Sequence, residues 1–138
     1  MSLSNYAENE LLDHLLGKGT RDFPSPTTLV VALFTAITGT ESPTDEPTFT
    51  EVANANGYAR KAVTFGATSN GSAKNSADVT FDTCNGGDWG TVTHIGVYDN
   101  ATYGGDNLLL YGALTVSKNI QDGDTFEIKT NNLTVTLD

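Results

Sequence analysis

The sequence predicts a mainly β protein, an antiparallel β-sandwich of about seven to eight short strands with one N-terminal α-helix. Only the first segment places apolar residues at helical spacing, and short apolar or alternating stretches separated by turn residues follow it. Charged residues make up 17% of the chain, below the usual ~25%, whereas threonine, which suits a pleated sheet, is abundant. Helical and strand patterns do not alternate, so a parallel α/β sheet is not expected.

The length and charge of the chain restrict the possible classes. Its 138 residues are expected to form a single domain, 1–138, with one core. There are 17 acidic and 7 basic side chains, a formal net charge of −10, which disfavours nucleic acid and an anionic membrane as partners. No apolar run reaches the ~18–20 residues of a transmembrane helix, and the N-terminus lacks the pattern of a signal peptide.

Residues 1–17 are expected to contain the helix. Ser4 is a suitable N-cap, and Gly17 can end the helix in a left-handed conformation. A helix of about three turns is marginal alone and must pack against the rest of the protein. Its apolar stripe consists of Ala7, Leu11, Leu12, Leu15 and Leu16.

After this helix the apolar pattern changes to that of strands. Residues 29–34 form a continuous apolar run, which predicts a strand covered on both faces. Residues 39–56, with Pro43 and Pro47, are expected to form a long surface loop, and loops of this length often contact a partner. Further strands are expected at 58–65, 79–81, 91–98, 108–115, 124–129 and 133–137.

The sequence contains no convincing catalytic or metal-binding pattern. His94 lies in the middle of a predicted strand and is interpreted as a partly buried, hydrogen-bonded histidine. Asp122-Gly123-Asp124 resembles the start of a calcium loop, but the later ligands are missing, so a tight turn is the better interpretation. Cys84 has no base placed to activate its thiol. We therefore predict no catalytic residue, no cofactor and no metal, and hence no enzyme.

The distribution of apolar residues predicts self-association. The runs 29–34 and 108–111 are apolar on both strand faces, and one short helix can cover only part of two such strands. A homo-oligomer, a dimer or trimer, is therefore expected to cover the remainder. The candidate interface residues are Leu11, Leu12, Leu15, Leu16, Leu29, Val31, Leu33, Leu108 and Leu110.

Several segments together resemble a family of small bacteriophage virion proteins, of the capsid decoration (cement) or tail-fibre type. These segments are 2–9 (SLSNYAEN), 11–17 (LLDHLLG), 26–35 (PTTLVVALFT), 57–65 (GYARKAVTF), 89–94 (WGTVTH), 112–115 (GALT), 123–126 (GDTF) and 133–137 (LTVTL). The resemblance implies a structural protein without catalysis or cofactor. Similar proteins coat phage heads as dimers or trimers, and others form parts of fibres.

The resulting hypothesis is a capsid decoration protein, made in the bacterial cytoplasm and located in the virion, which bridges major capsid subunits. In this hypothesis the loop 39–56 contacts the shell. The alternative is a tail-fibre or tail-associated module that binds tail proteins or a host-surface glycan, with Tyr103, Trp89 and Asn/Asp-rich loops exposed. A phage hydrolase is a third possibility, but the sequence selects no convergent pair of carboxyl groups for it.

Overall fold

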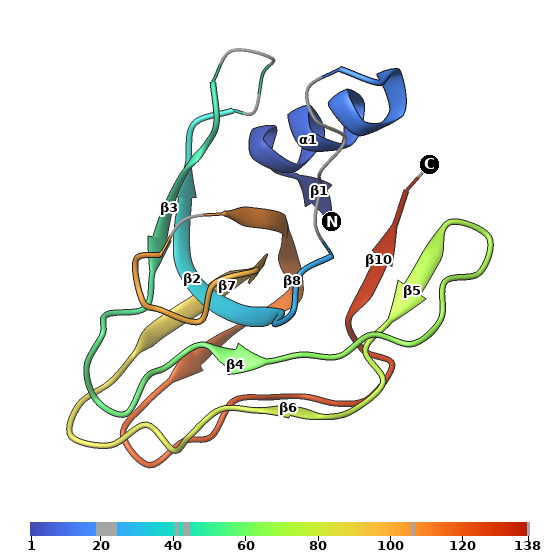
Figure 1. Cartoon of the computed structure of the whole chain (residues 1–138). Helices are drawn as coiled ribbons and strands as arrows, with labels where there is room; N and C mark the ends of the chain where they lie inside the picture. The colour runs from blue at the N-terminus through green and yellow to red at the C-terminus, as the bar shows by residue number, and fades with distance from the viewer. Residues whose placement is uncertain (19–24, 41, 43–44, 106, 138) are drawn as a thin grey trace.

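The structure is a computed structural model that describes residues 1–18, 25–40, 42, 45–105 and 107–137. Within this part of the chain there is one helix, α1 (Asn5–Leu16), and all strand pairings are antiparallel (Figure 1). The prediction of a mainly β protein with one N-terminal helix is therefore confirmed. The strands are β1 (Ser2–Leu3), β2 (Val30–Thr38), β3 (Thr48–Glu51), β4 (Lys61–Ala62), β5 (Ser72–Lys74), β6 (Val79–Thr80), β7 (Gly90–Tyr98), β8 (Leu108–Ile120), β9 (Glu127–Ile128) and β10 (Thr134–Thr136).

The central sheet has the order β1-β8-β7-β2-β3, and β4 also pairs with β2. Two smaller two-stranded sheets, β5–β10 and β6–β9, complete the described strands. In Figure 1, β4 and β6 cross below the curved central strands, whereas β5 and β10 stand to one side of them. The main core lies between one face of the central sheet and the layer that contains β6 and β9.

This main core uses the alternate side chains of the central strands. Val31 and Leu33 of β2 and Ile95 and Val97 of β7 are buried in it. It also receives Val63, which follows β4, and from the opposite layer Val79, Phe81, Phe126, Ile128 and Leu133. Apolar side chains therefore meet between two layers, as in a β-sandwich.

The other face of the central sheet carries a second buried cluster. It contains Val30, Ala32 and Phe34 of β2, so the apolar run is buried on both faces of the strand, as predicted. Residues from within the same chain cover part of this face, among them Phe49 of β3. Gly96 makes this packing possible, because a Cβ atom there would lie only 2.7 Å from Cε2 of Phe34.

The N-terminal segment attaches α1 to the sheet. Ser4 is the N-cap as predicted, since its side chain accepts a hydrogen bond from the backbone N–H of Ala7 at 3.2 Å. The Ser4 hydroxyl donates to the carbonyl of Leu108, and its backbone N–H donates to the carbonyl of Leu109 at 3.0 Å. Gly17 ends the helix with φ 66°, also as predicted. The helix buries only Ala7.

The strand boundaries differ from the predicted ones. The interval 39–56 is not a continuous loop, because β3 lies within it and pairs with β2 in the register Ile37 to Phe49; residues 41, 43 and 44 lie outside the described residues. The alternation Thr48-Phe49-Thr50 is the period-two signal that the flanking prolines obscured. The expected strand 58–65 shortens to β4, and β8 runs past 115 to Ile120.

A buried asparagine connects the smaller sheets. Asn75 is fully buried, and its side-chain amide donates to the carbonyls of Ala77 at 2.8 Å and Lys129 at 3.0 Å. Its side-chain oxygen accepts the backbone N–H of Leu133 at 2.9 Å. This residue follows β5, which lies in a stretch that the sequence presents only as a polar connector. The side-chain amide of Asn75 thus pairs with backbone groups that have no strand partner where the short strands end.

Candidate functional site

The predicted interface residues divide into a buried and an exposed group. Val31 and Leu33 are fully buried in the main core, and Leu108 is buried in the second cluster, so one chain already covers these side chains. Leu29 and Leu110 are partly buried against the main core. Together with Leu11 they line an apolar groove of about 300 Å³, to which α1, β8 and the β5–β10 sheet contribute.

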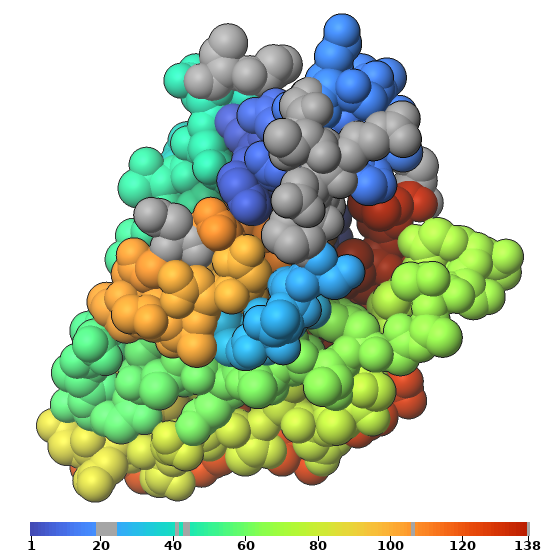
Figure 2. Space-filling view, in the orientation of Figure 1, coloured from blue at the N-terminus to red at the C-terminus, as the bar shows by residue number. Residues whose placement is uncertain are grey.

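The exposed group is the C-terminal half of α1. Leu12, Leu15 and Leu16 have exposed fractions of 53%, 65% and 67%. We call these three residues the helix leucine surface. In Figure 2 this end of α1 forms part of the upper edge of the molecule. These three candidate interface residues of α1 are therefore exposed, whereas those of the core strands are buried or partly buried.

The residues considered for catalysis have structural roles. His94 is partly buried and its Nδ1 lies 2.8 Å from the hydroxyl of Thr93, which confirms the interpretation of a hydrogen-bonded histidine. The thiol of Cys84 donates to the carbonyl of Gly87 at 3.0 Å, and burial raises its pKa. Asp122 accepts the backbone N–H of Gly86 at 2.8 Å, as a turn residue does. No group of three or more metal-ligating side chains occurs among the described residues.

Trp89 is not available for the glycan contact that the tail-fibre alternative assigned to it. Its side chain is buried, and its indole N–H donates to the carbonyl of Asn56 at 2.9 Å. The ring packs edge-on against Tyr58 and Phe81 in the main core. The prediction of an exposed Trp89 is therefore wrong, because the layer that contains Phe81 covers the ring. Tyr103, in contrast, is 40% exposed.

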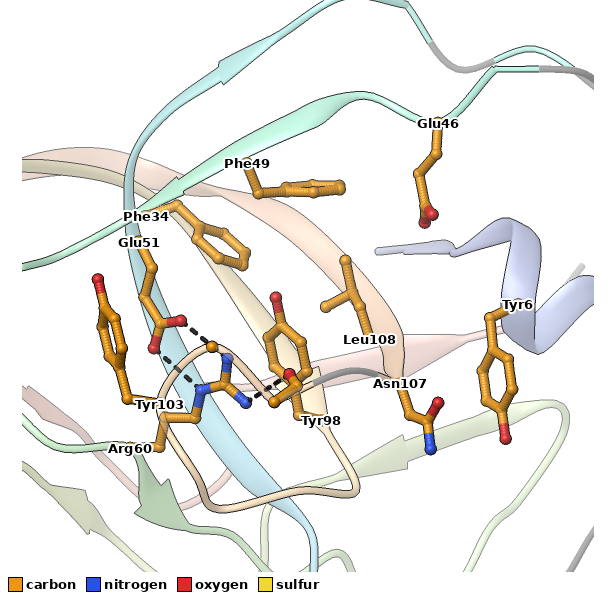
Figure 3. A pocket seen from close by; sticks show the side chains of 12 residues that line it. Tyr6, Phe34, Glu46, Phe49, Glu51, Arg60, Tyr98, Tyr103, Asn107 and Leu108 are labelled. Atoms are coloured by element: carbon orange, nitrogen blue, oxygen red, sulfur yellow. Dashed lines mark hydrogen bonds and ion pairs between the residues drawn. The ribbon is translucent and has the colours of Figure 1, made fainter. Parts of the chain in front are cut away.

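Tyr103 stands at a pocket of about 530 Å³ that we call the aromatic pocket (Figure 3). Phe34, Phe49 and Tyr98 supply aromatic rings from three strands of the central sheet. Figure 3 shows Tyr103 on one side of these rings and Tyr6, from the first turn of α1, on the other. The remaining polar lining comes from Glu46, Glu51, Arg60 and Asn107.

A buried ion pair forms one wall of the aromatic pocket. Nη2 of Arg60 lies 2.8 Å from Oε2 of Glu51, and Nε of Arg60 donates to Oε1 at 3.0 Å. The same carboxylate accepts the hydroxyl of Tyr58 at 2.8 Å. Bidentate geometry of this kind is the strong form of an Arg–carboxylate contact. Burial acts to lower the pKa of Arg60, but Glu51 outweighs it, so the pKa is raised and the guanidinium stays charged.

Arg60 also positions the loop that carries Tyr103. Its Nη1 donates to the carbonyls of Asn100 at 2.9 Å and Gly105 at 3.2 Å, on either side of Tyr103. Its guanidinium carbon lies 3.8 Å from the centre of the Tyr98 ring, a cation–π contact. One side chain therefore joins β3, β7 and the loop 99–105.

Sequence reasoning missed this arrangement. Arg60 lies in one of the segments that carry the family resemblance, 57–65, but its partner Glu51 lies in the interval expected to be a loop. The available signal is that Arg60 lies in the predicted strand 58–65, two residues after Tyr58. An arginine that is buried in a strand needs a carboxylate and carbonyl groups as partners. Several acidic residues were equally possible partners.

A family model described as "Podophage GP4 fiber I protein gp80" matches residues 2–136, which is nearly the whole chain. No curated protein matches the sequence closely enough to be a relative. No helix in the described part of the chain has the length and apolar character needed to cross a membrane. The chain belongs to the family of the podophage GP4 fiber I protein gp80, and it is a phage structural protein.

Proposed function

We propose that this chain is a non-catalytic subunit of a phage virion fibre and that its copies associate through the helix leucine surface. The observation that carries the proposal is the exposure of Leu12, Leu15 and Leu16 on one short helix. The family description names a fibre component, which supports a fibre more directly than a head coat. The structural roles of His94 and Cys84 support the absence of catalysis.

The helix leucine surface has the properties of a subunit contact. Burying one leucine contributes roughly 1.5–3 kcal/mol, and three neighbouring leucines on one helix form a contiguous apolar patch. The start of the helix is fixed to β8 by Ser4, so the patch is presented on an ordered support. A second copy of this chain offers the same apolar stripe, which is the usual arrangement in a two-fold interface.

The charge of the chain gives the association a salt dependence. Subunits with a net charge of −10 repel one another at low ionic strength. Added salt screens this repulsion over a Debye length of about 10 Å at 0.1 M, while apolar contact between leucines is not weakened. We therefore expect association to strengthen as the salt concentration rises from low values.

The capsid decoration hypothesis remains the second candidate, because it uses the same self-association and differs in location. It assigned the shell contact to 39–56, but β3 is part of the central sheet, so less free loop is available for that contact. The number of copies in each virion separates the candidates. Quantitative mass spectrometry of purified virions, against the major capsid protein, should find a number typical of a tail appendage. Hundreds of copies would support the head and contradict the fibre.

Variants of α1 test the self-association. Sedimentation of the purified chain should show an oligomer that Leu15→Glu/Leu16→Glu converts to monomer. Both side chains are exposed, so the melting temperature of the monomer should change little. Val116→Glu, on β8 and 62% exposed, is the matched control and should leave the oligomer intact. A double variant that still associates as strongly as the unmodified chain would contradict the assigned surface.

A further inference from the structure

The aromatic pocket combines ring faces with hydrogen-bond acceptors in one hollow, and we propose that it binds a neutral sugar ring. A sugar ring has apolar C–H faces and a hydroxylated edge. The rings of Tyr6 and Tyr103, with exposed fractions of 36% and 40%, can pack against the apolar faces of the sugar. The carboxylate of Glu46 and the amide of Asn107 can form hydrogen bonds with its hydroxyl groups. The proposal adds a ligand to the fibre subunit, but its test does not depend on self-association.

The charge distribution disfavours an anionic ligand. Glu46 and Glu51 line the pocket, and Glu10 and Asp99 act on Tyr6, whose pKa is raised by burial and by these two carboxylates. Arg60 is the cation among the lining residues, but its donors are directed to Glu51 and to the carbonyls of Asn100 and Gly105. A phosphate or an acidic sugar would therefore meet negative potential without a cation to bind it.

The same ion pair disfavours a cationic ligand. Arg60 neutralises the charge of Glu51 and lies against the ring of Tyr98 at 3.8 Å from its centre. One face of the Tyr98 ring, which a lysine or a quaternary ammonium group could use, is thus occupied by a cation of the protein itself. A neutral ligand with an apolar face and hydroxyl groups fits the remaining surface better than either charged class.

The pocket is also held in shape before a ligand arrives. The loop that carries Tyr103 has its own hydrogen bonds, from the N–H of Thr102 to the Asn100 side chain at 2.9 Å and from the N–H of Gly105 to Thr102 at 2.9 Å. Arg60 binds both sides of this loop. Tyr103 therefore loses little freedom on binding, which is the condition for a weak ligand such as a single sugar to bind measurably.

The test is an NMR titration of the full chain with simple probes. The neutral probes are the methyl glycosides of glucose, galactose, mannose and N-acetylglucosamine, and the charged probes are trilysine and inorganic phosphate. At least one neutral probe should produce saturable shifts in the backbone amides of Gly104, Gly105 and Asn107. Tyr103→Ala should weaken this binding about three- to tenfold, the effect of one aromatic contact, whereas Tyr103→Phe should retain it.

Two controls keep the result interpretable. Val116→Ala removes an exposed apolar side chain outside the pocket and should leave the titration unchanged. Tyr6→Ala removes the ring on the other side of the pocket and should weaken binding even if Tyr103→Ala disturbs its loop. Absence of shifts with all four glycosides would overturn the proposal, as would stronger binding of trilysine or phosphate. Equal affinity in both alanine variants and the unmodified chain would also overturn it. None of these results would alter the oligomer or the copy number that test the fibre proposal.

Discussion

The two faces of the central sheet are built from the same strands but are covered differently. One face, which we call the sealed face, is closed over Val31 and Leu33 by the layer with Phe81 and Phe126, and the apolar groove lined by Leu29 and Leu110 lies at its edge. The other, which we call the open face, contains Phe34 and Tyr98, and the aromatic pocket leaves part of it accessible. A continuous apolar strand therefore indicates burial on both faces, but it does not show that both coverings are complete.

The open face obtains part of its order from a buried ion pair. Arg60 and Glu51 form its wall and fix the loop beside it. Removing water from two charges is costly, and the pair is stable only because each remaining donor and acceptor has a partner. A partly covered aromatic surface can in this way remain rigid while it stays open to a ligand.

The largest expected effect is a loss of unfolding free energy when one aromatic residue of each face is removed in turn. Phe81→Ala empties a buried site of the sealed face and should lower the free energy of unfolding by about 3–5 kcal/mol. Phe49→Ala on the open face removes a half-buried ring and should cost roughly half as much. Urea denaturation of both variants measures the difference. Equal losses would mean that the open face is as fully packed as the sealed one.

The second prediction breaks the ion pair of the open face. Arg60→Met leaves Glu51 buried without its partner and should lower the free energy of unfolding by about 3 kcal/mol. Adding Glu51→Gln should restore part of this loss, because the uncompensated charge is then removed as well. A double-mutant cycle in urea measures the coupling. Additive losses in the two single variants would contradict a coupled pair.

The smallest effect concerns an exposed polar network at the edge of the sealed face. Hydrogen bonds from the side chain and backbone of Thr130, and from Lys129, lower the pKa of Asp78 to about 2 from an ordinary 3.8. A carboxyl with a lowered folded-state pKa stabilises the protein above its unfolded pKa, and this contribution is lost as the pH falls toward 2. Asp78→Asn should therefore flatten the decline in melting temperature between about pH 4 and pH 2. An unchanged decline would show that other carboxyl groups cause it.

Local sequence patterns were sufficient to predict those helices and strands whose own residues contain capping or periodicity signals. Ser4 and Gly17 define the helix ends, and the run 29–34 identifies the central strand. Alternation also located β7 and β10, although their ends moved by one or more residues. The strand β5, in contrast, is defined by its pairing with β10, and its residues show no apolar alternation in the sequence.

The candidate site depended on contacts between distant segments and could be predicted only in part. The tail-fibre alternative required both Tyr103 and Trp89 to be exposed; Tyr103 is exposed, but Trp89 lies in the core. Arg60, Glu51 and the loop 99–105 meet only because β2 brings β3 and β7 together. The sequence also did not show that residues of the same chain cover the second face of β2. Phe49, which covers part of it, lies in β3, the strand that the flanking prolines obscured.

The pairing of β1 with β8 has a consequence for synthesis of the protein. Ser2 and Leu3 pair with Tyr111 and Leu110, so β1 can join the sheet only after β8 has been synthesised. The central sheet also places β2 beside β7 across a long interval of sequence. Folding dominated by such distant pairings is slow compared with that of helical proteins. The central sheet is therefore completed only after β8 has been synthesised, and until then the apolar β2 segment is exposed to aggregation.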